Sequence, residues 1–195
     1  MNYLAFYKPY EVLSQFTDPH ERRTLKEFIR VAGVYPAGRL DYRSEGLLIL
    51  SDDGLFIQRL SDPRYDHPKT YLVQVEGIPT ESDIGRLNTE ILIPSIQTKP
   101  VQARIIPPPD LIPRSKPVRD YHPTAWLQII LTEGKKHQVR RLTAAIGLPT
   151  LRLVRVAIGS IQLGTLQPGE WRVLSSVELR KTMKALEISK ARSKI

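Results

Sequence analysis

Residues 38–54 read GRLDYRSEGLLILSDDG and carry the clearest structural signal in the chain. A polar loop, residues 38–45, leads directly into the apolar run 46–50, and Asp52-Asp53-Gly54 then turns the chain. An apolar run of this length between two turn signals predicts a buried strand. Because reactive side chains tend to lie on loops that a rigid scaffold holds in place, this loop is also the first place to look for a functional site.

Short strand patterns and short helix patterns alternate around this strand, which indicates a mixed α and β protein. Thr24 and Glu27 form the signature of a capping box, and apolar residues at helical spacing continue to Gly33, so a helix is expected there. Residues 107–123 are rich in proline and are expected to form a long exposed loop. We expect strands over residues 2–7, 46–51, 71–75, 102–106, 126–132, 151–163 and 171–174, and helices over residues 25–32, 55–60, 80–87 and 137–146.

The composition excludes several classes of protein and site. The chain has 195 residues, 41% of them hydrophobic and 25% charged, which is typical of a folded domain, and no apolar run approaches the ~20 residues of a membrane span. The absence of cysteine excludes disulfides, thiolate metal sites and cysteine nucleophiles, and it fits a reducing, cytoplasmic location. The four histidines lack metal-ligand spacing and there is no glycine-rich nucleotide motif, so neither a metal nor a cofactor is expected.

The charge of the chain indicates a polyanionic partner. Lys and Arg number 29 against 20 Asp and Glu, a formal net charge of +9, and such a surplus favours nucleic acid. Residues 180–195 contain six basic residues and one acidic residue, so this tail carries +5 and the rest of the chain about +4. Two interpretations of the tail stay open, a frayed and solvated end or a segment that grips RNA.

Three groups of polar residues could carry chemistry, of which the first lies in the loop before the apolar strand and the second at the start of another expected strand. Asp41 lies between Arg39 and Arg43. Neighbouring cations keep a carboxylate ionised, as a nucleophile requires, and the alternative is an aspartate that caps a turn. Tyr71, in Lys69-Thr70-Tyr71, could stack on a nucleobase, or it could pack in the core as aromatic residues in strands commonly do.

The third group is the expected helix over residues 137–146 and the segment before it. Helical spacing places His137, Arg140 and Arg141 on the side opposite the apolar face. Lys135 and Lys136 precede the helix, where backbone amides also attract anions. These donors suit a phosphate backbone or an acidic side chain, and the alternative is an ordinary amphipathic helix with a basic face in solvent.

Taken together and in this order, the segments resemble the RsuA branch of pseudouridine synthases. The resemblance rests on Lys8-Pro9, GRLDYRSEGLLILSDDG, KTYLVQVEG, EGKKHQVRRLTAAIGLPTLRLVRVAIG and LQPGEWRVL, which reach from the start of the chain to about residue 174. KPYEVLSQFTD and KTYLVQVEGIPT are most similar to the E-type group of that branch, whose members act on the large ribosomal subunit. The chain departs from many members in beginning directly at the catalytic domain, without an S4-type RNA-binding domain, and in having Tyr42 where many have arginine.

The resemblance implies an α+β fold with a bent, mixed and mainly antiparallel sheet, flanking helices and a central cleft. It implies a catalytic domain over residues 1–177, in a smaller part to about residue 66 and a larger sheet part after it, followed by the basic tail 178–195. It also implies an isomerase, monomeric and without a cofactor, that converts a uridine of ribosomal RNA to pseudouridine. The first expectation for the substrate is 23S rRNA.

The same resemblance implies roles for individual residues. Asp41 is expected to attack C1′ of the ribose or to abstract the 2′ proton, and both routes stay open. Tyr71 is expected to stack on the flipped base and is a candidate for removing the C5 proton, while Arg140 is expected to pair with Asp41 and place it. Contacts to the RNA are expected from Arg39, Lys69, Lys135, Lys136, His137 and Arg141.

Several alternatives stay open at the level of the sequence. Asp41 and Glu45 could form the carboxylate pair of a hydrolytic N-glycosidase or glycosidase. The substrate could be 16S rRNA or tRNA in place of 23S rRNA. The same scaffold could also serve as a non-catalytic RNA-binding assembly factor.

Overall fold

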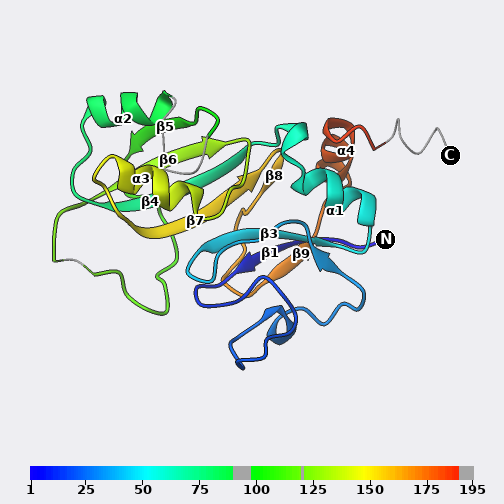
Figure 1. The fold of residues 1–195 in the computed structure, drawn as a ribbon. Helices are drawn as coiled ribbons and strands as arrows, with labels where there is room; N and C mark the ends of the chain where they lie inside the picture. Colours follow the sequence, from blue (N-terminus) through cyan, green and yellow to red (C-terminus); the bar gives the residue numbers. More distant parts are fainter. Residues whose placement is uncertain (90–97, 120, 189–195) are drawn as a thin grey trace.

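The computed structural model describes residues 1–89, 98–119 and 121–188 of the chain (Figure 1). Its strands are β1 (Tyr3–Lys8), β2 (Tyr35–Pro36), β3 (Glu45–Ser51), β4 (Lys69–Glu76), β5 (Gln102–Ile106), β6 (Thr124–Leu131), β7 (Thr150–Ile158), β8 (Ile161–Gln162) and β9 (Trp171–Val173). Its helices are α1 (Gly54–Ser61), α2 (Glu81–Asn88), α3 (Gln138–Ala145) and α4 (Ser176–Ala185), with 3-10 turns over Leu25–Glu27 and Pro63–Tyr65. None of these helices has the length and apolar character that crossing a membrane requires.

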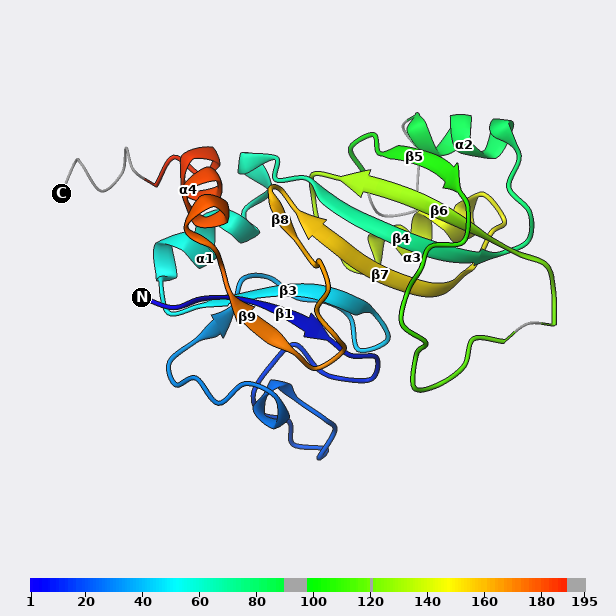
Figure 2. The same cartoon turned by 180° about the vertical axis from the view of Figure 1, so that it is seen from behind.

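One mixed sheet organises the described chain, with the strand order β5-β6-β4-β7-β3-β1-β9. All neighbours in this order are antiparallel except β3 and β7, which run parallel. The short strands β2 and β8 pair with β3 and β7. Figure 2 shows the sheet in two halves, a larger one of β7, β4, β6 and β5 and a smaller one of β3, β1 and β9. The predicted α+β class with a mainly antiparallel sheet is confirmed.

The two halves of the sheet meet at a short parallel pairing, which we call the junction. It consists of Glu45 opposite Val154 and Gly46 opposite Arg155. Gly46 has φ +103°, and a Cβ atom added there would lie 2.2 Å from the carbonyl oxygen of Arg155. Only glycine fits this position, because a side chain would strain the backbone and collide with the neighbouring strand. The junction therefore fixes the end of the 38–45 loop against β7.

Helices cover the sheet and close its apolar cores. In the larger half, Leu87 of α2 and Leu142 of α3 are buried together with Val73 of β4 and Leu127 of β6. In the smaller half, β1 and β3 are buried along their whole length, which explains their continuous apolar sequences. One face of these two strands packs against α1 and the C-terminal segment, and the other packs against the loop that contains Leu25.

The helix predicted over residues 25–32 is wrong, because the segment forms only the 3-10 turn Leu25–Glu27. The Thr24 side chain accepts from the amide two residues on, and Glu27 binds Arg23 instead of returning to the Thr24 backbone. Apolar residues of the segment are buried against β1 and β3. Tertiary packing therefore shapes the segment and overrides its local preference for a helix.

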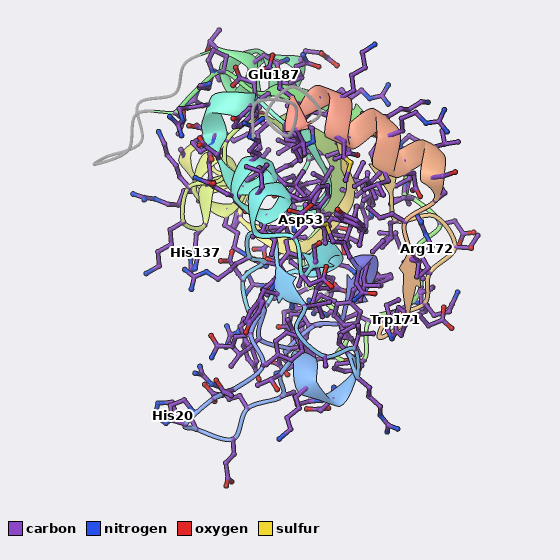
Figure 3. All side chains as sticks on the ribbon, turned by 90° about the vertical axis from the view of Figure 1, so that its right-hand side faces the viewer. His20, Asp53, His137, Trp171, Arg172 and Glu187 are labelled. Atoms are coloured by element: carbon purple, nitrogen blue, oxygen red, sulfur yellow. The ribbon has the colours of Figure 1, made fainter. Side chains whose placement is uncertain are left out.

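The chain returns to the smaller half at its C-terminal end. β9 pairs with β1, and α4 follows a capping box formed by Ser175 and Glu178. Arg172 of β9 binds both carboxylate oxygens of Glu178, at 2.6 and 2.8 Å. Figure 3 shows Trp171 and Arg172 of β9 on the side of the molecule opposite His137. The smaller half is thus built from both ends of the described chain, whereas the sequence predicted a smaller part that ends at about residue 66.

The basic tail predicted over residues 178–195 is not frayed in its described part. Residues up to 185 continue α4, and Leu186 and Ile188 are fully buried against the smaller half. Lys181 and Lys184 are exposed on α4, so the alternative of a segment that grips RNA stays a prediction. The remaining part of the tail lies outside the described residues.

Leu186→Ala is expected to lower the free energy of unfolding by about 2–5 kcal/mol, because it leaves a cavity in the core beneath the C-terminal segment. Val177→Ala, at an exposed position of α4, is the matched control and is expected to change stability by less than about 0.5 kcal/mol. Urea unfolding followed by circular dichroism measures both variants. Equal stability of the two would mean that residue 186 is not part of the core.

Candidate active site

A cavity of about 540 Å³ opens between the two halves of the sheet. Its wall contains residues 37–42 of the loop before β3, Lys69 and Tyr71 at the start of β4, and residues 134–139 leading into α3. Arg155 of β7 lies in the wall next to the junction. The three polar groups singled out in the sequence, which are far apart along the chain, therefore meet around one cavity.

The loop that carries Asp41 is held by hydrogen bonds on both sides of that residue. The Ser14 hydroxyl accepts from the Leu40 amide at 3.0 Å and donates to the Leu40 carbonyl at 2.9 Å. The Ser44 amide donates to the Asp41 carbonyl at 3.0 Å and closes a turn. The Asp41 side chain is 34% exposed and lies in the cavity wall. A carboxylate on a loop held in this way is preorganised for chemistry.

His137 and Tyr71 reach the cavity from the elements beside this loop. His137 Nε2 lies 3.4 Å from Asp41 Oδ1, and the residue has left-handed backbone geometry, with φ 56°, at the N-terminal end of α3. Tyr71 is almost fully buried, and its place in β4 is on the same face as Val73 and Val75, as the alternation of the sequence predicted. The site thus combines a carboxylate, an imidazole and an aromatic ring.

The Arg140 side chain contacts the backbone of the loop that carries Asp41. Its Nη2 donates to the Arg43 carbonyl at 2.8 Å, and its Nη1 donates to the Thr150 carbonyl at 3.3 Å. Burial lowers the pKa of the Arg140 guanidinium, and the negative charge of Asp41 opposes that shift. The two charged groups therefore attract each other electrostatically. Among the described residues, Asp41 forms an ion pair within 4.0 Å with His137 and forms none with Arg140. The direct pairing expected between Arg140 and Asp41 is therefore not seen.

Most of the cations predicted to contact RNA lie around the cavity. Burial and the nearby charge of Arg155 lower the pKa of the Lys69 ammonium to about 8. Arg141 lies on α3, outside the cavity wall. The wall itself contains Arg39, Lys69, Lys135, Lys136 and His137. The exposed members of this set place positive charge at the cavity, where a phosphate backbone can bind.

Glu45 is not available as a second carboxylate for the reaction. It is buried at the junction, outside the cavity wall, and accepts two hydrogen bonds from Arg152, both at 3.0 Å. A glycosidase needs two carboxylates that flank the bond to be broken. This geometry disfavours a hydrolase built on Asp41 and Glu45. Within the described ranges, no group of three histidine, aspartate or glutamate side chains forms a metal site.

Arg155 is a cavity residue that the sequence patterns did not single out. It is 3% exposed, its Nε donates to the Leu47 carbonyl at 2.8 Å, and its Nη1 lies 3.5 Å from the Tyr71 hydroxyl. The signal in the sequence is an arginine inside the apolar stretch LVRVAI. A charge on a buried strand needs a specific partner or a function, so such a residue can be found by looking for this exception to the pattern.

Lys8 is fully buried close to the site. Its ammonium donates to the carbonyls of Pro9 and Val12, at 2.8 and 2.7 Å, and so shapes the chain that follows β1. Burial lowers the pKa of this ammonium to about 7, against the opposing charges of Glu45 and Asp41.

The stability of the protein is expected to rise with pH between about 7 and 10.5 through Lys8. The unfolded lysine keeps its proton up to its ordinary pKa of 10.5, whereas the folded one releases it above about 7, so stability falls as the pH falls through this range. One such group gives a slope of about 1.4 kcal/mol per pH unit. Urea unfolding of the wild type and of Lys8→Met at about pH 7 and pH 9.5 measures it. A stability difference between the two proteins that does not change with pH contradicts this prediction.

Comparison with known proteins identifies the family. The family model described as RNA pseudouridylate synthase matches residues 2–145. The ribosomal large subunit pseudouridine synthase E of Xanthomonas campestris pv. campestris is 54% identical over 171 residues, covering 85% of this chain and 91% of that protein. The protein of the same name from Vibrio vulnificus is 50% identical over 174 residues, covering 88% of this chain and 74% of that protein.

A solved structure supports the same relationship. It is described as a pseudouridylate synthase, and it superposes with a TM-score of 0.78 and 28% sequence identity, covering 93% of this chain and 73% of that one. The agreement extends over both halves of the sheet, because so little of the chain lies outside it. With the family model and these relatives taken together, the chain belongs to the RNA pseudouridylate synthase family and is an isomerase.

Proposed function

We propose that the protein isomerises one uridine of large-subunit ribosomal RNA, 23S rRNA in bacteria, to pseudouridine. The two relatives are named for this reaction on the large subunit, and about half of their aligned residues are identical to those of this chain. The structural observation that carries the proposal is that the Asp41 carboxylate and the Tyr71 ring share one cavity. The cavity also contains the cations that an RNA substrate requires.

The reaction rearranges bonds without adding or removing atoms. The C1′–N1 bond breaks, the uracil turns in the site, and a C5–C1′ bond forms, after which C5 loses a proton and N1 gains one. Asp41 attacks C1′ as a nucleophile and is released later, or it abstracts the 2′ proton and returns it. Either route leaves the carboxylate unchanged. The detached uracil must stay oriented throughout, which a cavity between two rigid half-sheets can achieve.

The target uridine must leave its stack before it reaches Asp41, at a cost of about a few kcal/mol. Contacts between phosphates and the cations of the cavity offset this cost. Tyr71 stacks on the extruded base, and Arg140 holds the Asp41 loop through the Arg43 carbonyl and through its charge. We assign the contacts with the RNA to Arg39, Lys69, Lys135, Lys136, His137 and Arg141.

The remaining proposals concern the whole molecule. We infer that the catalytic residues all lie within residues 1–177, that Leu186 and Ile188 complete the core that supports them, and that exposed cations of α4, such as Lys181 and Lys184, add affinity for RNA. The protein acts as a monomer in the cytoplasm, where ribosomal RNA is assembled into particles. Removal of the two charges is then expected to weaken binding and to reduce its dependence on salt.

Pseudouridine mapping tests the proposed function. Ribosomal RNA from cells with and without the gene is treated with carbodiimide, which makes reverse transcription stop at pseudouridine. One stop in 23S rRNA is expected to disappear with the gene and to return when the purified enzyme is added. A stop that disappears from 16S rRNA or tRNA instead changes the substrate, and an unchanged set of stops contradicts the proposal.

A further inference from the structure

Two buried polar atoms in residues of the cavity wall have no hydrogen-bond partner within the described part of the chain. They are Nη2 of Arg155 and Oγ of Ser44. Buried polar groups are nearly always hydrogen-bonded, and leaving one unpaired costs about 1–3 kcal/mol. Both atoms belong to residues that line the same cavity as Asp41 and Tyr71. Both residues are therefore candidates for contact with a molecule bound in the cavity.

The charge of Arg155 is also without a carboxylate. Among the described residues its side chain contacts the Leu47 carbonyl and the Tyr71 hydroxyl, and it forms no ion pair within 4.0 Å. Arg152, on the same strand and similarly buried, binds both oxygens of Glu45. The strand therefore carries one arginine with a complete structural pairing and one whose pairing is incomplete. An incompletely paired buried charge in a cavity is characteristic of a functional group.

The position of Arg155 suits the edge of a base that stacks on Tyr71. The guanidinium carbon lies 6.0 Å from the centre of the Tyr71 ring, and Nη1 lies 3.5 Å from the hydroxyl at the rim of that ring. A base stacked on the ring presents its polar edge to groups at the rim. The Arg155 backbone is fixed by its pairing with Gly46, and its Nε is fixed by Leu47. The two terminal nitrogens of the guanidinium are therefore held in place as donors.

We propose that the guanidinium of Arg155 donates a hydrogen bond to a carbonyl oxygen of the flipped uracil, both before and after the base turns. This inference rests on the proposed function. Turning uracil about the axis through N3 and C6 exchanges N1 with C5 and O2 with O4. A single fixed donor therefore meets a carbonyl oxygen in both orientations, and it retains the detached base while the base turns.

The same contact selects uracil over cytosine. Cytosine has an amino group at C4 in place of O4, and this amino group is a hydrogen-bond donor. In one of the two orientations it would face the guanidinium of Arg155, which has donors only. Two donors facing each other leave both unpaired, and this penalty disfavours the wrong base. Arg155 is thus a substrate-binding residue that determines specificity.

Sulfur substitution in the substrate tests the contact. Short RNA hairpins carry uridine, 2-thiouridine or 4-thiouridine at the mapped position, and single-turnover rates are measured with enzyme in excess. Sulfur is a weak acceptor, so the wild type is expected to slow roughly 10-fold or more with each thio-substrate. Arg155→Met is expected to be roughly 10- to 100-fold slower with uridine and to show less than about twofold further loss with sulfur. Arg104→Met, an exposed arginine of β5, is the matched control and keeps the wild-type sulfur effect.

The outcomes separate this inference from the proposed function. An equal sulfur effect in the wild type and in Arg155→Met overturns the inference and leaves the proposed function standing. A wild-type enzyme that makes no pseudouridine in the uridine hairpin overturns the proposed function itself. If circular dichroism shows that Arg155→Met does not fold, Arg155→Lys replaces it. Its ammonium lacks the forked geometry of the guanidinium, so the sulfur effect must again shrink, and an undiminished effect overturns the inference.

Discussion

Asp41→Asn is expected to slow pseudouridine formation by roughly four orders of magnitude. The amide has the size of the carboxylate but neither attacks C1′ nor accepts the 2′ proton. The contacts of Ser14 and Arg140 with the loop are made to its backbone, so the loop keeps its shape. Affinity for RNA is expected to stay within about threefold of the wild type, because phosphates are bound by cations. Release of tritium from C5-tritiated RNA measures turnover, and filter binding measures affinity.

Asp110→Asn is the control for this prediction. Asp110 is an exposed residue of the proline-rich loop, so its variant changes the net charge in the same way without touching the cavity. Its turnover is expected to equal that of the wild type. Full activity of Asp41→Asn would remove the aspartate from the mechanism and favour a non-catalytic RNA-binding factor. A loss of RNA binding that matches the loss of turnover would give Asp41 a structural role instead.

Gly46→Ala is expected to destabilise the protein by more than about 4 kcal/mol, a loss large enough to prevent folding of many domains. The added Cβ would lie 2.2 Å from the oxygen and 2.7 Å from the nitrogen of Arg155, and both are backbone atoms that cannot swing aside. The positive φ of Gly46 adds strain for any residue with a side chain. Because the junction joins the two half-sheets, relieving the collision means separating them. Thermal unfolding of the soluble fraction measures the effect.

Gly54→Ala gives the comparison that isolates the collision. A Cβ at Gly54, the first residue of α1, would meet no atom within 4 Å. This variant is expected to leave stability unchanged or raise it by up to about 1 kcal/mol, through the lower entropy of the unfolded chain. A Gly46→Ala protein as stable as Gly54→Ala would show that the two strands do not meet at this distance.

The periodicity of the sequence predicts individual elements well and their arrangement poorly. The strand over residues 46–51 follows directly from an apolar run bounded by turn residues, and the strand over residues 102–106 is bounded by prolines; the structure confirms both within one residue. Strand order depends on contacts between distant segments, which no local pattern encodes. The failed helix at residues 25–32 shows the same limit, since burial against β1 and β3 decides its conformation. The proline-rich loop contacts the segment after β1 through Arg114, whose guanidinium carbon lies 4.1 Å from the centre of the Tyr10 ring.

The sequence predicts those site residues whose type or spacing is unusual for the segment in which they lie. Asp41 lies in a conspicuous polar loop, Tyr71 is an aromatic residue at the start of an expected strand, and the structure brings both to one cavity. The partners of Arg140 are backbone carbonyls, which a sequence does not reveal. The local pattern does not single out Arg155, because its neighbours in the strand are apolar and are typical of a core. Arginines within buried strands therefore merit the same scrutiny as polar loops.

The pairing of β9 with β1 has a consequence for how the protein is made. Phe6, near the start of the chain, lies opposite Trp171, near its end. During translation β1 leaves the ribosome long before β9 does. One edge of β1 is therefore unpaired in the meantime and can pair with other chains. The half-sheet that supports Asp41 is complete only after residues 171–173 have left the ribosome and paired with β1. A nascent chain that has not yet released β9 is therefore expected to be inactive.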